Sequence, residues 1–188
     1  MGTGSIIDER ALAVGERVFI RKPGFSDEKE FMHNVARSRK FHYPWIVNKT
    51  NNSFFTAYLL RFERGSEGHL VCSNETGAIV GVININDIAR GALQSGYLGF
   101  YSFLPYARKG YLSEGLQLII ERAFYTLNLH RLEANIQPQN TASKSFIMRH
   151  GFSREGYSRR YLKVNGRWKD HERWALLKDE WTGNKTIY

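Results

Sequence analysis

The feature that most constrains this chain is a strand, a basic turn and a long helix in direct succession. Tyr97 to Tyr101 has strand character, the turn holds Arg108, Lys109 and Gly110, and residues 116–124 have helical apolar spacing. In this order the free backbone N–H groups of a helix N-terminus point at the turn and can bind an anion. Gly110 lacks a Cβ, so a phosphate can approach the main chain. The stretch predicts a pyrophosphate site, and the alternative is a basic helix start with ordinary turn chemistry.

The familiar nucleotide-binding motifs are absent from the sequence. It contains neither Gly-x-Gly-x-x-Gly nor Gly-x4-Gly-Lys-Ser/Thr, which argues against a Rossmann domain and a P-loop. The length of 188 residues fits one domain with a core of its own. No internal repeat or shift in composition marks a boundary. We therefore expect a single domain over residues 1–188, with residues 1–15 as a loose leader.

The charge and the cysteine content limit the partners and the compartment. A formal net charge of +9 favours acidic partners such as RNA, a nucleotide cofactor or the ribosome surface. Cys72 is the only cysteine, which excludes an intramolecular disulfide and fits a reducing cytosol, as well as many secreted proteins. We expect its thiol to be a small buried side chain and not a nucleophile. No signal peptide and no apolar run of membrane-spanning length is evident. The expectation is a cytoplasmic protein, monomer or homodimer, with no membrane contact.

The elements alternate between helical and strand patterns, which predicts a mixed α/β fold. Gly110 begins the central helix, and Asn165–Gly166 is a strong hairpin signal. The expected elements are strand 17–21, helix 26–39, helix 53–62, turn 65–68, strands 69–72 and 78–85, loop 86–91, strand 94–103, helix 110–128, strand 131–136, helix 141–150 and a hairpin ending in strand 168–177.

This order, together with three stretches of sequence, resembles the GNAT N-acetyltransferase family, and within it the RimJ/RimL branch of ribosomal-protein-alanine N-acetyltransferases. The stretches are 97–114, 130–152 and 155–171, and the resemblance covers about residues 15–182. It implies a central mixed, mostly antiparallel, twisted sheet flanked by helices. It also implies transfer of an acetyl group from acetyl-CoA to an amine, with no metal.

The resemblance implies a cofactor site around the basic turn. The family's pyrophosphate loop reads Gln/Arg-x-x-Gly-x-Gly/Ala, and here Gly110 matches it while Ala107 and Leu112 do not. Asn140 corresponds to the family's asparagine beside the cofactor, and its alternative role is an N-cap for the following helix. The implied cofactor-binding residues are Phe100, Tyr101, Ser102, Arg108, Lys109, Gly110, Tyr111, Leu112, Ser113 and Asn140.

The implied catalytic residues depart from the family's usual set. Many relatives use a tyrosine as acid seven residues after the asparagine, and Ile147 stands there. Ser143 matches the serine that RimL-like members are proposed to use, and its alternative role is a first-turn helix residue with a local hydrogen bond. Asn135 occupies the usual position of the base and cannot act as one. Glu133, two residues earlier on the same strand face, is the candidate base through a water, and its alternative is a salt bridge.

The final hairpin carries the implied acceptor site and a set of basic residues. The predicted substrate-binding residues are Tyr161, Trp168, Asp170 and His171; the alternative for Asp170 and His171 is a structural tie to the neighbouring strand. The basic set, with aromatic residues interleaved, predicts an RNA or ribosome contact, and its alternative is a solvated face. Its members are Arg154, Arg159, Arg160, Lys163, Arg167, Lys169 and Arg173.

The expected function is acetylation of the N-terminal α-amine of a ribosomal protein. Two alternatives remain open: acetylation of a small amine such as an antibiotic or an amino-acid metabolite, and a ribosome-binding assembly factor in which catalysis is secondary.

Overall fold

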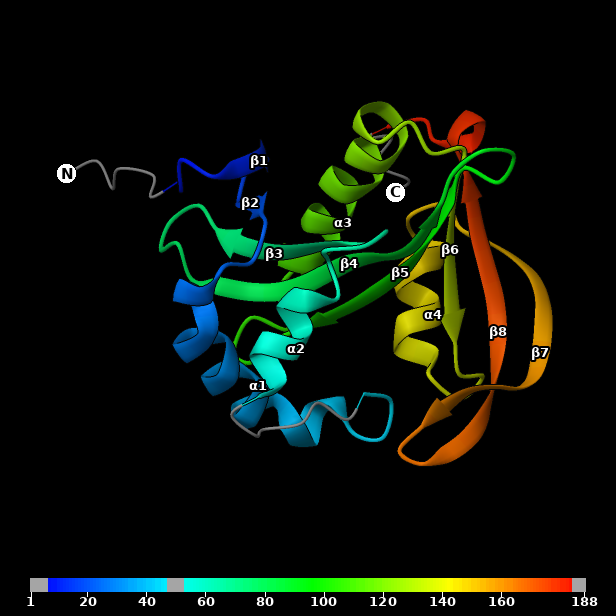
Figure 1. The fold of residues 1–188 in the computed structure, drawn as a ribbon, viewed down its shortest axis with the longest axis horizontal. Helices are drawn as coiled ribbons and strands as arrows, with labels where there is room; N and C mark the ends of the chain where they lie inside the picture. The colour runs from blue at the N-terminus through cyan, green and yellow to red at the C-terminus, as the bar shows by residue number, and fades with distance from the viewer. Residues whose placement is uncertain (1–6, 47–52, 184–188) are drawn as a thin grey trace.

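The computed structural model describes residues 7–46 and 53–183. Its centre is an eight-stranded sheet in the order β1-β2-β3-β4-β5-β6-β8-β7, in which every neighbouring pair is antiparallel except β5 and β6 (Figure 1). This confirms the predicted fold class. The strands are β1 Ala11–Val14, β2 Val18–Arg21, β3 Glu67–Ser73, β4 Ile79–Ala89, β5 Ser95–Ser102, β6 Arg131–Ile136, β7 Ser153–Val164 and β8 Arg167–Leu177.

Helices cover both faces of the sheet (Figure 1). The α-helices are α1 Glu28–His42, α2 Phe54–Leu60, α3 Tyr111–Glu121 and α4 Thr141–Met148. Short 3-10 segments lie at η1 Phe25–Asp27 and η3 Lys178–Glu180, and the π-helical turn η2 Arg122–Thr126 continues α3.

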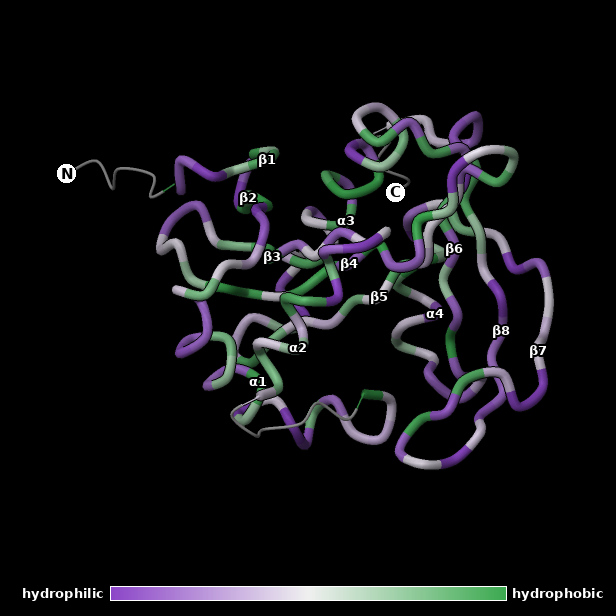
Figure 2. The backbone as a smooth tube through the Cα atoms, viewed as in Figure 1, coloured by the Kyte–Doolittle hydropathy of each residue, from purple (hydrophilic) through white to green (hydrophobic). Residues whose placement is uncertain are grey.

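The hydrophobic core has two layers, one on each face of the sheet. Side chains of α1 and α2, such as Phe31 and Phe55, pack on Leu70 and Val82 of the central strands. Side chains of α3 and α4, such as Ile119, pack on the opposite face of the same strands. In Figure 2 the central strands β3 and β4 are hydrophobic where they pass between these helices. Burial of apolar area on both faces is the main stabilising contribution to such a fold.

The two strands at the middle of the sheet separate along their length. The parallel ladder between β5 and β6 covers only Ser95–Tyr97 against Arg131–Glu133. Beyond it, β5 stays paired with β4 as far as Ser102, while β6 stays paired with β8 as far as Ile136. The result is a V-shaped gap between the strands, visible in Figure 1 between β5 and β6. The two strands therefore diverge toward their C-terminal ends, each held by its other neighbour.

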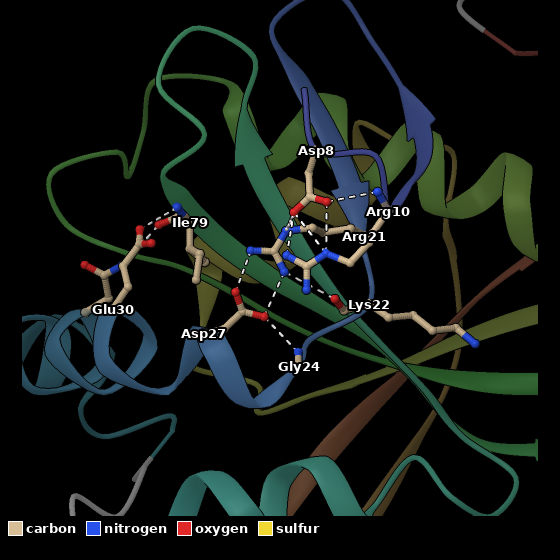
Figure 3. A network of polar contacts seen from close by, with 9 residues as sticks. Asp8, Arg10, Arg21, Lys22, Gly24, Asp27, Glu30 and Ile79 are labelled. Carbon is tan, nitrogen blue, oxygen red and sulfur yellow. Dashed lines mark hydrogen bonds and ion pairs between the residues drawn. The ribbon is translucent and has the colours of Figure 1, made fainter. Parts of the chain in front are cut away.

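The N-terminal region is held in the sheet by a cluster of charges. Arg21 Nη2 lies 2.6 Å from Asp27 Oδ1, and Arg21 Nε lies 3.2 Å from Asp8 Oδ2 (Figure 3). A hydrogen bond from Arg10 lowers the pKa of Asp8 to about 2. Residues 11–14 form β1, so the prediction of a loose leader over residues 1–15 is wrong for that strand. The first six residues lie outside the described ranges, and a single domain over 1–188 stays a prediction.

The other element predictions differ mainly at their boundaries. β6 has the predicted bounds, and the Asn165–Gly166 turn joins β7 to β8 as expected. The predicted loop 86–91 is wrong, because β4 continues to Ala89 through an irregular register where Asp87 has a φ of 50°. The predicted turn 65–68 is shorter, since β3 starts at Glu67. The predicted helix 110–128 is α3 followed by the π-helical turn.

Candidate active site

A groove of about 700 Å³ lies between β5, the start of α3 and α4. Most of the predicted cofactor residues line it, namely Phe100, Tyr101, Ser102, Arg108, Gly110, Leu112, Ser113 and Asn140. Lys109 and Tyr111 are outside the lining. Residues that the sequence reading missed also line it, among them His42, Trp45 and Arg149.

The basic turn has the backbone of an anion-binding loop. Arg108 and Gly110 both have positive φ, 64° and 85°, and Gly110 is the N-cap of α3. For Arg108 such a conformation is strained, and strain of this kind is concentrated at functional sites. The backbone N–H groups of Gly110, Tyr111 and Leu112 have no hydrogen-bond partner among the described residues. Open N–H groups at a helix start fit the pyrophosphate of acetyl-CoA, as the sequence predicts.

The turn is fixed by Arg17, the residue immediately before β2. Its guanidinium donates to the Lys109 carbonyl at 2.9 Å and lies 4.3 Å from the centre of the Tyr111 ring. Its backbone N–H donates to Glu114 Oε1 at 2.7 Å, which ties the first turn of α3 to the sheet. Lys109 and Tyr111 therefore support the loop from its outer side.

The start of α4 reaches the groove through Asn140 and Ser143. Asn140 Oδ1 accepts a hydrogen bond from the Ser143 backbone N–H at 3.2 Å, so Asn140 is the N-cap of α4 and also lines the groove. The Ser143 hydroxyl has no partner among the described residues. At the other end of α4, His150 Nε2 lies 2.9 Å from Ser113 Oγ, which joins α4 to the start of α3.

A second pocket of about 390 Å³ adjoins the groove. The two share Trp45, Ile46, Phe100, Asn140 and Ser143. Ser143 and Asn140 thus lie at the junction between the groove and the pocket. Both diverging strands line this pocket, β5 with Tyr97, Leu98, Gly99 and Phe100 and β6 with Ala134, Asn135 and Ile136. The pocket is also lined by Arg61, Asn86, Asp87, Gln137, Tyr161, Leu162, Val164 and His171.

The four predicted substrate residues divide into two groups. Tyr161 and His171 line the pocket, with their rings 6.1 Å apart. Trp168 is 60% exposed on the hairpin and is not part of the pocket wall. Asp170 is used within the hairpin: its carboxylate accepts the Tyr157 hydroxyl at 2.6 Å and the Arg160 N–H at 2.7 Å. Trp168 and Asp170 are therefore poorly placed to touch an acceptor in this pocket.

His171 is a buried imidazole with one occupied nitrogen. Its Nδ1 lies 3.0 Å from the Lys169 carbonyl oxygen, which can only accept, so Nδ1 carries the proton. Burial lowers the pKa of His171, and the hydrogen bond to Lys169 opposes that shift. The ring is therefore neutral near pH 7, with its Nε2 lone pair available.

The contacts of Glu133 differ from those that its predicted role as general base requires. Its Oε1 accepts from Arg131 Nε at 2.9 Å, and Arg131 also pairs with Glu155 on β7. Glu133 is not among the residues that line the pocket, whereas Asn135 on the same strand face is. This geometry matches the salt-bridge alternative and not the catalytic one.

Three further observations complete the description of the cysteine, of clustered metal-ligand residue types and of the helices. Cys72 is buried, and burial raises the pKa of its thiol to about 12, which makes it unsuited to nucleophilic attack. Among residues 7–46 and 53–183, no group of three or more His, Cys, Asp or Glu side chains could hold a metal ion. Within the same ranges, no helix has the length and apolar character needed to cross a membrane.

Comparison with known proteins identifies the family. The acetyltransferase (GNAT) domain model matches residues 17–153. The [ribosomal protein uS5]-alanine N-acetyltransferase of Escherichia coli is 36% identical over 176 residues, which cover 89% of this chain and 91% of that protein. The structure of the ribosomal-protein-S5-alanine acetyltransferase from Vibrio fischeri superimposes with a TM-score of 0.77 at 25% identity, covering 90% of this chain and 97% of that one.

A more distant structure has the same fold. Mycobacterium smegmatis RimJ in complex with CoA-disulfide superimposes with a TM-score of 0.79 at 23% identity, over 87% of this chain and 83% of that one. Together with the groove, the basic turn and the gap in the sheet, these matches show that the chain belongs to the GNAT family and is an acetyl-CoA-dependent N-acetyltransferase of the RimJ/RimL-like branch.

Proposed function

We propose that this enzyme acetylates the N-terminal α-amine of a protein, and that a ribosomal protein is its preferred acceptor. The observation that carries the proposal is the charge of the acceptor pocket. Among its described lining residues, Asp87 is the only carboxylate and Arg61 the only cationic side chain. A polyamine or an aminoglycoside carries several positive charges and needs several carboxylates, whereas a neutral peptide backbone needs amide partners. Asn86, Asn135 and Gln137 supply such amides.

The acid–base chemistry of the pocket also favours an α-amine. An α-amine titrates near ~8 and a lysine side chain near ~10.4, so the α-amine needs less help to lose its proton. Glu133 is engaged by Arg131, and beside the amide of Asn135 the pocket offers the neutral imidazole of His171. A weak base is sufficient for the first kind of amine and poor for the second.

The relatives support a ribosomal acceptor. The Escherichia coli relative is named for alanine acetylation of ribosomal protein uS5, and the Vibrio fischeri structure for the same kind of substrate. A protein of the ribosome as acceptor would put the enzyme in the cytoplasm. Acetylation of a small amine is the alternative within the same chemistry.

The residues around the junction have distinct proposed roles. Acetyl-CoA, when bound, supplies the thioester carbon that the amine attacks. Gly110 and its neighbours would hold the pyrophosphate through backbone N–H groups, while Phe100, Tyr101 and Ser102 line the path toward the junction. Ser143, with its hydroxyl without a protein partner among the described residues, would donate a proton to the departing sulfur.

We further propose that the β7–β8 hairpin contacts ribosomal RNA. All three acids of the hairpin are engaged: Glu155 with Arg131, Glu172 with Lys144, and Asp170 inside the hairpin. Glu172 also pairs with one cation of the set, Arg154, at 3.6 Å. The other exposed cations of the set make no ion pair with these acids among the described residues, and the exposed rings of Tyr157 and Trp168 lie among them. Cations that pair with phosphates beside rings that stack on bases suit RNA better than an acidic protein. This contact is the feature that would favour the ribosome-binding alternative.

An acceptor screen tests the proposed function. The enzyme and acetyl-CoA are incubated with peptides that have a free N-terminus, with spermidine and with an aminoglycoside, and free thiol is measured. The proposal expects thiol release with peptides and little with the polycations. Faster release with a polycation would contradict it, and binding to ribosomes without release would support the assembly-factor alternative.

A further inference from the structure

We propose that His171 and Asn135 form the seat for the acceptor amine, and that His171 Nε2 takes the proton that leaves its nitrogen. This deepens the proposed function and rests on it only for the identity of the molecule that carries the amine. Glu133, the carboxylate expected from the sequence, has no part in this seat.

The two side chains come from neighbouring strands and share one face of the sheet. Asn135 on β6 lies directly opposite Arg173 on β8, and His171 is two residues before Arg173. Because residues two apart on a strand point the same way, Asn135 and His171 are diagonal neighbours. Both line the pocket that Ser143 closes at the junction with the cofactor groove. An amine between them would therefore lie at the mouth of the gap between β5 and β6.

Each side chain offers an acceptor without a protein partner. His171 donates from Nδ1 to the Lys169 carbonyl, which leaves the Nε2 lone pair without a partner among the described residues. Asn135 Oδ1 is buried and has no hydrogen-bond partner among them either. A buried acceptor left unpaired is destabilising, so a ligand that supplies an N–H binds more tightly by pairing with it.

A primary amine is the chemical group that fits two such acceptors. It has two N–H groups to donate and one lone pair, and donation to Nε2 and Oδ1 leaves the lone pair free to attack. His171 is only 3% exposed, so its ring is held away from bulk water. The seat thus fixes the direction of attack as well as the position of the nitrogen.

The proton balance assigns one proton to each side of the junction. The amine nitrogen gains a bond to the acetyl carbon and loses one proton, while the carbon–sulfur bond breaks and the sulfur gains one proton. His171 Nε2 accepts the first, and Ser143 or water supplies the second. The imidazolium then releases its proton to solvent, and Ser143, where it was the donor, regains a proton from solvent, which restores the starting state.

The hairpin holds His171 in place. Between Ser158 and Leu162, β7 carries extra residues relative to β8, and Arg160 has a φ of 48°. Asp170 fixes this bulge by accepting the Arg160 N–H. The bulge directs the Tyr161 ring against His171, and bulges beside active sites often re-aim a side chain in this way. Asp170 is thus a positioning residue.

The charged and titratable groups around His171 come from several elements. They are Arg61 of the segment after α2, Asp87 on β4, Tyr97 on β5, Tyr161 on β7 and Asp170 beside His171 on β8. A pH dependence of kcat is therefore assigned to His171 only if it disappears in a variant that lacks the imidazole.

The test compares His171→Gln, His171→Ala and Asn135→Ala with His33→Gln, a control at an exposed position on α1. The probes are an alanine-first peptide and L-alaninamide. Calorimetry without acetyl-CoA measures amine binding, and thiol release measures turnover from pH 5 to 9. His171→Gln keeps an acceptor oxygen but no base, so binding should persist while kcat falls about 10²–10⁴-fold. His171→Ala and Asn135→Ala should weaken binding as well.

The pH profile separates a chemical role from a structural one. In the wild type, the pH profile of kcat should show a protonation step below the ordinary histidine range. This step should be absent in His171→Gln and present in His33→Gln. An unchanged profile in His171→Gln, or unchanged amine binding in both alanine variants, would overturn the proposal. If alaninamide reacts and the peptide does not, the peptide function fails while the seat remains tested on alaninamide.

Discussion

The substitution Gly110→Ala adds one methyl group and tests whether the turn at this position binds the cofactor. Its φ of 85° is in the left-handed region, where a residue with a Cβ costs roughly 1–2 kcal/mol more than glycine. An added Cβ would also lie 3.3 Å from Arg17 Nη1, part of the guanidinium that holds the loop. In Gly110→Ala we expect the free loop to relax away from this conformation.

The cofactor would then have to restore the loop as it binds. A penalty of about 1–2 kcal/mol corresponds to about a 5- to 30-fold loss of acetyl-CoA affinity. Loss of one charge-assisted N–H contact would add about 1.5–3 kcal/mol to this penalty. Isothermal titration calorimetry measures the affinity, and a thermal melt shows whether the variant is folded.

Gly91→Ala is the matched control. Gly91 has a φ of 67° with nothing within 4 Å of an added Cβ, and it lies in the loop between β4 and β5, away from the groove. It should lose similar stability and no affinity. A folded Gly110→Ala protein with wild-type affinity, or an equal loss in Gly91→Ala, would refute the anion-loop reasoning.

Three further predictions follow from the site and its surroundings. Ser143→Ala should lower kcat at least tenfold with unchanged acetyl-CoA affinity, because it removes only the donor to the sulfur; untouched turnover would give that role to water. Changing Arg159, Arg160 and Lys163 to Glu should abolish co-sedimentation with ribosomes at moderate salt, and equal sedimentation would leave the hairpin a solvated face. Burial lowers the pKa of several histidines, so the unfolded chain binds more protons, and stability should fall as pH drops below about 6.5. Thermal melts between pH 7.5 and 5.5 check this, and a constant melting temperature would contradict it. These histidines are His42, His69, His150 and His171.

Local patterns predicted those parts of the fold that local forces determine. The strict alternation of polar and apolar residues from Arg131 to Ile136 predicted the bounds of β6, and Asn165–Gly166 predicted the hairpin. The end of β4 was missed because its bulge contains Asn86 and Asp87, which are typical of loops. β1 was missed because its four residues are held by pairing with β2, whose Arg21 is in turn bound by Asp27.

The sequence predicted the parts of the site that depend on local backbone geometry. It did not predict the parts that depend on side-chain contacts between strands distant in the sequence. Gly110 and Asn140 act through local turn and cap geometry, which the sequence encodes within a few residues. The partner that engages Glu133 is Arg131, itself shared with Glu155 on another strand, and this needs the sheet order. His42 and Trp45 reach the groove from the end of α1, and the Tyr43–Pro44–Trp45 break signals only that the helix ends.

The most direct test of the central claim is the position of the acetyl group on one peptide. The peptide begins with alanine, contains an internal lysine, and is incubated with the enzyme and acetyl-CoA before fragmentation mass spectrometry. We predict one acetyl group, on the α-amine, because the pocket has a neutral imidazole and a single carboxylate for its described lining. Acetylation of the lysine as fast as the N-terminus, or of neither, would contradict the account.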